Sequence, residues 1–158
     1  MSESPVTPAG VSIENDVADI AIRQMIASQV EAWNSHDARA WSLAFDEQAG
    51  FVNIRGIGMS GRAEIEATHA RIFSGIYAGS HSTVTVHRIT MLGTDTAVAE
   101  TEHRVTGYAA LPPGVVPTDE PGVLRTRMTY VFHRSEAPEW KIVHGHNTAI
   151  LPTLARRP

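Results

Sequence analysis

The stretch from His81 to Tyr108 decides the fold. It reads HSTVTVHRITML (81–92), GTD (93–95) and TAVAETEHRVTGY (96–108). From residue 81 onward the hydrophobic pattern repeats every two residues, as in a β-strand, whereas before it the pattern repeats at helical spacing. The three residues 93–95 are short enough for a hairpin loop. The stretch therefore predicts two adjacent antiparallel strands.

Two further strands are predicted after this hairpin. They cover Val123–Arg134 and Trp140–Ile150, and the residues Ser135–Glu139 between them form a second short loop. The longer link Ala109–Gly122 carries four prolines and is typical of a surface loop. Together the four runs predict a strand meander in the second half of the chain.

The first half of the chain is predicted to be mainly helical. A first helix begins at Asn15 or Asp16 and continues to about Trp33, with apolar residues at helical spacing. Asp37 caps a short second helix that extends through Phe45. A first strand at 51–54 and a third helix beginning at 60–61 follow. The apolar face of the third helix contains Ile65, His69, Ile72, Phe73 and Ile76.

Helices followed by a strand meander indicate the α+β class, in which a curved antiparallel sheet wraps over three helices. We expect residues 1–12 to form a mobile arm, 13–151 a single domain and 152–158 a C-terminal tail. A pocket can form where the concave face of such a sheet does not close on the helices.

Composition excludes several classes of function. The 158 residues are 42% hydrophobic and 19% charged, which is typical of a globular domain. A net charge of −4 predicts no nucleic-acid or membrane partner, and the lack of cysteine excludes thiolate chemistry. No signal peptide or membrane-spanning run is visible, so we expect a cytoplasmic protein.

Known cofactor motifs are also missing. The sequence contains no G-x-G-x-x-G after a strand, no P-loop and no G-x-S-x-G, so we predict no cofactor and no redox chemistry. His144 and His146 share one strand face, with His133 and His103 on neighbouring strands. Their spacing matches no standard zinc motif, and contact with a partner subunit is the favoured interpretation over a metal site.

Several polar residues lie where a pocket is expected, and each allows two interpretations. If the strands are regular, Asn53, Arg104, Tyr130 and Asn147 form one set. Arg104 lies in mid-strand, either outward and solvated or inward and paired, because an unpaired buried guanidinium is very unfavourable. His69 is either a core histidine or a general base, and Asn53 either a pocket group or an edge residue.

Five segments resemble the SgcJ/EcaC group of the SnoaL-like, nuclear transport factor 2-like superfamily, which includes ketosteroid isomerase and scytalone dehydratase. They are AWNSHD (32–37), FVNIRG (51–56), SGR (60–62), HARIF (69–73) and WKIVHGHNT (140–148). The resemblance covers about residues 16–150. It implies a cone-shaped cystatin-like fold, a small organic ligand and a homodimer formed through the outer face of the sheet.

RVTGY (104–108), TYVFHR (129–134) and the run 140–148 also resemble the association domain of calmodulin-dependent kinase II. In that family the positions that match His69, Arg104, Tyr130 and Asn147 line a pocket for small acids. Two of its pocket arginines fall on Tyr130 and Asn147 here. The resemblance therefore implies that only Arg104 remains as a permanent cation.

Alignment with ketosteroid isomerase places that enzyme's tyrosine on Gln29 and its aspartate base on Asn53, and an amide cannot abstract a proton. We therefore expect His69 as base, Tyr130 as acid, and Gln29, Trp33, Asn53, Arg104 and Asn147 as substrate-binding residues. The expected function is a pocket protein, acting on a cyclic or polyketide-type metabolite as a cofactor-independent isomerase, cyclase or dehydratase. The alternative is a non-catalytic association module.

Overall fold

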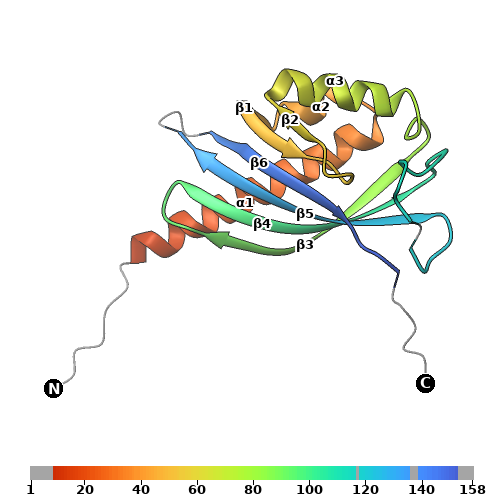
Figure 1. Cartoon of the computed structure of the whole chain (residues 1–158). Coiled ribbons are helices and arrows are strands. Elements are labelled where there is room, and N and C mark those ends of the chain that lie inside the picture. The colour runs from red at the N-terminus through yellow and green to blue at the C-terminus, as the bar shows by residue number, and fades with distance from the viewer. Residues whose placement is uncertain (1–8, 117, 136–138, 153–158) are drawn as a thin grey trace, which may run out of the picture.

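A computed structural model describes residues 9–116, 118–135 and 139–152 (Figure 1). Within these ranges the chain forms three helices and one six-stranded sheet. The helices are α1 (Ala9–Asn34), α2 (Ala38–Ser42) and α3 (Arg62–Phe73). The strands are β1 (Phe45–Val52), β2 (Gly58–Ser60), β3 (His81–Met91), β4 (Thr96–Thr106), β5 (Val123–Arg134) and β6 (Trp140–Ala149).

The sheet has the order β2-β1-β6-β5-β4-β3. The last four strands follow one another as the predicted meander, and their bounds agree with the prediction to within two residues. Strand β1 joins β6 in parallel, while all other neighbouring strands in the order are antiparallel. The α+β class is therefore confirmed, with a mixed rather than wholly antiparallel sheet.

The three helices lie on one face of this sheet. Figure 1 shows α1 running across that face, with α2 and α3 near the β1–β2 end. The apolar side chains of α1 at Ile22 and Ile26 are fully buried against it. We use "concave face" for the sheet face toward the helices and "convex face" for the other. The main core, which includes Phe45, Phe51 and Phe132, lies between the helices and the concave face.

Several predicted boundaries differ from the structure. The first helix begins at Ala9, so the last residues of the predicted 1–12 arm are helical, while residues 1–8 and most of the predicted 152–158 tail lie outside the described residues. The second helix ends at Ser42 instead of Phe45, although Asp37 caps it as predicted, accepting a hydrogen bond from the Ala40 N–H at 2.9 Å. Phe45 instead opens β1, because it pairs with Ile142 of β6. The first strand therefore runs from Phe45 to Val52 and not over the predicted 51–54.

Register shifts in β1, β3 and β6 interrupt the regular alternation of side chains. In β6 the shift lies between the partners of Val131 and Phe132, which are His144 and Ile142. As a result, Ile142 and Gly145 are both buried, although regular alternation would place them on opposite faces. None of the described helices has the length and apolarity needed to cross a membrane.

Candidate functional site

Two adjoining chambers lie between the helices and the concave face. The inner chamber has a volume of about 40 Å³, and its wall includes Gln29, His103, Thr126 and Tyr130. The outer chamber has a volume of about 370 Å³ and extends to exposed residues at its rim. The two chambers share wall residues, which are Trp33, Trp41, Ile54, Tyr77, Met128 and Asn147.

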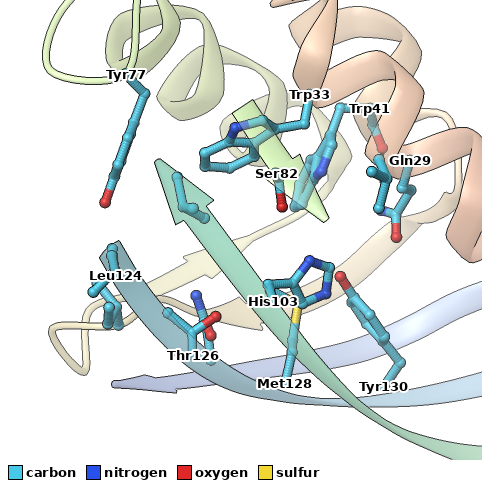
Figure 2. A pocket seen from close by; sticks show the side chains of 14 residues that line it. Gln29, Trp33, Trp41, Tyr77, Ser82, His103, Leu124, Thr126, Met128 and Tyr130 are labelled. Atoms are coloured by element: carbon cyan, nitrogen blue, oxygen red, sulfur yellow. Dashed lines mark hydrogen bonds between the residues drawn. The ribbon is translucent and has the colours of Figure 1, made fainter. Parts of the chain in front are cut away.

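The inner chamber is lined by uncharged side chains. Among the described residues no Asp, Glu, Lys or Arg contributes to its wall. Figure 2 shows His103 and Tyr130 extending from the sheet toward Trp41 and Gln29, which come from the helices. A charged ligand would lose its hydration here without gaining a counter-ion, so the wall favours an uncharged molecule.

Tyr130 of β5 is buried in this wall with a free hydroxyl group. No described residue forms a hydrogen bond with the hydroxyl, and burial raises the pKa of Tyr130 well above its usual range. The ring fits because its neighbour in β6 is Gly145, where an added Cβ would lie 3.2 Å from the Tyr130 ring and 2.8 Å from that of Phe51. Tyr130 therefore remains a protonated hydrogen-bond donor that faces the chamber.

Asn147 of β6 presents a second unused polar group. Its Oδ1 atom is fully buried and has no hydrogen-bond partner among the described residues. The side chain lines both chambers, opposite Met128 of β5. A buried acceptor without a donor is unfavourable by about 1–3 kcal/mol, so a ligand that donates a hydrogen bond would be stabilised here.

Gln29 and Trp33 lie in the wall as predicted. The Gln29 side chain donates from Nε2 to the Trp41 carbonyl oxygen at 3.3 Å, which directs its amide toward α2. Trp33 lines both chambers and donates from Nε1 to the Ser80 hydroxyl at 3.0 Å. Both side chains are therefore held in place by hydrogen bonds across the helices and the adjacent loops.

His69 of α3 lies in the outer chamber instead of beside Tyr130. Its ring stacks on Trp41 with centroids 3.7 Å apart, and Nδ1 donates to the Ile65 carbonyl oxygen at 2.7 Å. Burial lowers the pKa of His69 to about 4, against the weaker opposing effect of the Ile65 hydrogen bond. Because Tyr130 lines only the inner chamber, the predicted acid and base do not share one chamber.

Asn53 also lies in the outer chamber, but its carbonyl oxygen is already used. The Oδ1 atom accepts hydrogen bonds from the Arg55 and Ile57 N–H groups at 2.9 and 3.0 Å. These bonds close the turn between β1 and β2, as Asn side chains commonly do. The predicted substrate-binding role therefore depends on the amide nitrogen of Asn53 alone.

The predicted pocket location of Arg104 is wrong. Arg104 lies on the convex face, where it is exposed and forms an ion pair with Glu120. In the pairing of β4 with β5, Arg104 lies opposite Arg125, and Ala99 lies opposite Tyr130. Paired residues point to the same face, and Ala99 and Arg104 differ in parity along β4. Arg104 and Tyr130 therefore point to opposite faces. The proline-containing loop between β4 and β5 leaves this register undetermined in the sequence, which is why the grouping of Arg104 with Tyr130 failed.

His103 is a titratable wall residue of the inner chamber that was not among the predicted site residues. It lies one position before Arg104 and faces inward, and burial lowers its pKa to about 4. A usable signal was present, because all the charged residues of β4 share one parity, whereas the other holds only uncharged residues, which are Ala97, Ala99, Thr101, His103 and Val105.

The histidines of the sheet do not converge on a metal. His144 and His146 line a hollow on the convex face, whereas His103 lies on the concave face. In the described ranges no group of three His, Cys, Asp or Glu side chains has a geometry that could hold a metal ion.

Solved structures share this fold. A protein of unknown function with a cystatin-like fold from Nostoc punctiforme is 25% identical, with a TM-score of 0.72 over 87% of this chain and 80% of that one. A ketosteroid isomerase-like protein from Erwinia carotovora atroseptica is 14% identical, with a TM-score of 0.66 over 84% and 96%. A type 2 hexachlorocyclohexane dehydrochlorinase is 13% identical, with a TM-score of 0.72 over 93% and 97%.

No curated protein matches the chain significantly. A family model, described as a SnoaL-like domain, matches residues 22–152. This range contains every strand of the sheet and all of the wall residues named above. The chain therefore belongs to the SnoaL-like domain family.

Proposed function

We propose that the protein binds a small uncharged organic molecule across its two adjoining chambers, with the reacting carbonyl group in the inner one, and catalyses proton transfer on it without a cofactor. The reaction class is that of an isomerase, cyclase or dehydratase acting on a cyclic metabolite. Tyr130 is the acid, or the hydrogen-bond donor to an oxygen that gains negative charge. Asn147 accepts a hydrogen bond from the ligand and orients it.

The unpartnered Asn147 Oδ1 atom carries this proposal. An interior that serves only as a core has its buried polar groups paired. Here a buried acceptor and the free Tyr130 hydroxyl line the same uncharged chamber. This pattern supports a ligand with one acceptor and one donor group, such as a hydroxylated cyclic ketone.

The narrower resemblances are part of the proposal. The position of Arg104 on the convex face removes the cation that the kinase association domain resemblance assigned to the pocket, so a small acid is disfavoured. The two adjoining chambers, with their partly polar walls, support ligand binding. A protein that served only as an association module would need no such cavity. Membership of the SgcJ/EcaC group, a homodimer through the convex face and a cytoplasmic location stay predictions.

Exchange of α-protons on 2-tetralone in D₂O tests this function. The ketone is bicyclic and uncharged, and its methylene next to the ring and the carbonyl is acidic enough for slow exchange. We expect the protein to accelerate deuterium incorporation, followed by NMR, above the rate in buffer. Removal of one donor to a developing oxyanion reduces rates by roughly 10²–10³, so Tyr130→Phe is expected to lose most of the acceleration.

The matched control is Arg104→Met, which changes a convex-face residue of β4 and is expected to leave exchange unchanged. A second comparison replaces the ketone by 2-naphthoate, a bicyclic anion, which is expected to bind at least ten-fold more weakly. Equal exchange by wild type and Tyr130→Phe, or tighter binding of the naphthoate, would contradict the proposed function.

A further inference from the structure

His103 differs from His69 in its surroundings and is only half-buried, although both have lowered pKa values. The His69 ring packs against Trp41 in the outer chamber. The His103 ring lies in the inner chamber with Tyr130, Asn147 and Gln29. Only His103 therefore reaches the chamber that contains the free Tyr130 hydroxyl.

The hydrogen bonds around Thr101 determine which nitrogen of His103 carries the proton. Thr101 is fully buried, and its hydroxyl donates to the Met128 carbonyl oxygen at 3.3 Å. The same hydroxyl oxygen lies 3.2 Å from His103 Nε2. A hydroxyl has one proton, so while Thr101 donates it to Met128 the hydroxyl oxygen accepts at the His103 contact, and Nε2 carries the ring proton.

The consequence is a free lone pair on the other ring nitrogen. A neutral imidazole with its proton on Nε2 has an acceptor at Nδ1. No described residue forms a hydrogen bond with His103 Nδ1. Figure 2 shows the Tyr130 hydroxyl and the His103 ring extending into the same chamber. A basic nitrogen and a hydroxyl donor therefore face the same space.

We propose that His103 is the catalytic base of the inner chamber, that Thr101 is its positioning residue, and that the substrate is an uncharged ketone with an acidic C–H next to the carbonyl. This inference rests on the proposed function and replaces His69 as the base. Thr101 acts through His103 and does not touch the substrate.

The proton-transfer step balances within the chamber. His103 Nδ1 takes the proton from the α-carbon, and an N–H bond forms as the C–H bond breaks. The electron pair of that bond forms a C=C bond, and the carbonyl π pair moves to oxygen, which is stabilised by the Tyr130 hydroxyl. The imidazolium then delivers its proton to another carbon, giving isomerisation, or first trades it for a solvent deuteron in D₂O and delivers that deuteron to the same carbon, giving exchange. No charge enters or leaves the site.

The tautomer of His103 is tested first in the ligand-free wild-type protein. Long-range ¹H–¹⁵N correlation spectra distinguish a ring protonated on Nε2 from one protonated on Nδ1. We expect Nε2–H for His103. Thr101→Val removes the acceptor and is expected to mix the tautomers, whereas Thr101→Ser keeps the hydroxyl and is expected to restore the wild-type pattern. An Nδ1–H tautomer in wild type would overturn the inference.

Deuterium exchange on 2-tetralone then tests the role of His103. His103→Gln keeps an amide donor for Thr101 but has no basic nitrogen, and its folding is checked by thermal unfolding. We expect its exchange rate to fall by about 100-fold or more. The exchange rate of Thr101→Val is expected to fall by less than that of His103→Gln, and the rate of Thr101→Ser is expected to return to that of the wild type.

The outcomes separate the two proposals. Exchange that depends on Tyr130 but is unchanged in folded His103→Gln overturns the base assignment and leaves the proposed function standing. Exchange that is lost in His69→Gln but kept in His103→Gln assigns the base to the outer chamber instead. No acceleration by the wild-type protein overturns the proposed function and the role of His103 with it.

Discussion

The two faces of strand β4 have opposite chemistry although their residues alternate along one strand. Ala97, Ala99 and Thr101 are fully buried on the concave face, and His103 follows them into the inner chamber. On the convex face, Glu100 pairs with Arg88, and Glu102 contacts Arg125, Arg127 and His87. The charges of this strand are therefore all outside, where water solvates them.

This difference shows how the fold makes an uncharged site. The side-chain period of a strand is two, so a single register sorts every residue of β4 to one face or the other. The charged residues of β4, which alternate with the chamber residues along the strand, therefore point away from the chamber. The polar groups that remain inside are neutral hydrogen-bonding groups, which suits proton transfer on a neutral molecule.

The largest expected effect on stability comes from placing a charge on the concave face of β4, compared with the same charge at the neighbouring convex position. Ala99→Asp places a carboxylate at a position with no solvent exposure, and we expect a loss of about 3–5 kcal/mol in the free energy of unfolding, or no folded protein. Val98→Asp puts the same group on the partly exposed convex face, and we expect about 1 kcal/mol or less. Chemical denaturation measures both, and equal losses would contradict the assignment of the faces.

The second effect is a dependence of stability on pH that comes from the two histidines of the chambers. His69 and His103 have folded-state pKa values of about 4 against 6.5 for the free side chain. Between these values the unfolded state binds more protons, so stability is complete above about pH 6.5 and decreases as the pH falls toward 4.

The expected size follows from the two pKa values. Each histidine contributes a loss of about 3 kcal/mol over that window, because one pKa unit corresponds to about 1.4 kcal/mol. In His103→Gln the difference in unfolding free energy between pH 7 and pH 4 is expected to shrink by about this amount. An unchanged difference would mean that His103 is not buried in its neutral form.

Gly145 tests the close packing behind Tyr130. In Gly145→Ala the new Cβ would meet the Phe51 ring at 2.8 Å and the Tyr130 ring at 3.2 Å. We expect a loss of about 1–3 kcal/mol and reduced 2-tetralone exchange, because Tyr130 must move. Gly58→Ala is the control, since no atom lies within 4 Å of its added Cβ. A Gly145→Ala protein as stable and active as the control would contradict this packing.

The smallest effect is expected on the convex face. Hydrogen bonds from Arg125 and His87, with the nearby charges of Arg125 and Arg127, hold the pKa of Glu102 below its usual value of 4.5. Ion pairs with solvent-exposed partners contribute little, so Glu102→Gln is expected to lose about 0.5–1 kcal/mol. This contribution is present above pH 4.5 and is lost as the pH falls through the lowered pKa. Chemical denaturation at pH 7 and pH 3 measures the stability lost in Glu102→Gln. A larger loss at pH 3 than at pH 7 would contradict the lowered pKa of Glu102.

Local patterns in the sequence predicted much of the fold. The period-two runs gave β3 to β6, and Asp37 marked the start of α2. The parallel pairing of β1 with β6 was not predictable, because it joins segments almost a hundred residues apart with no turn to fix their register.

The site was predicted less well, for the same physical reason. Tyr130, Gln29, Trp33 and Asn147 line the inner chamber as expected, but Arg104 does not. Face assignments across a long loop or a bulge depend on register, which a single sequence does not determine. Within β4 itself, alternation alone would have selected His103 over Arg104.

The most direct test of the central claim is a titration of histidine-labelled protein with 2-tetralone, followed by NMR. If the ligand enters the uncharged chamber, the His103 resonances shift first and most, His69 in the adjoining chamber shifts less, and His144 and His146 on the convex face do not change. Shifts at His144 and His146 with none at His103 would contradict the account.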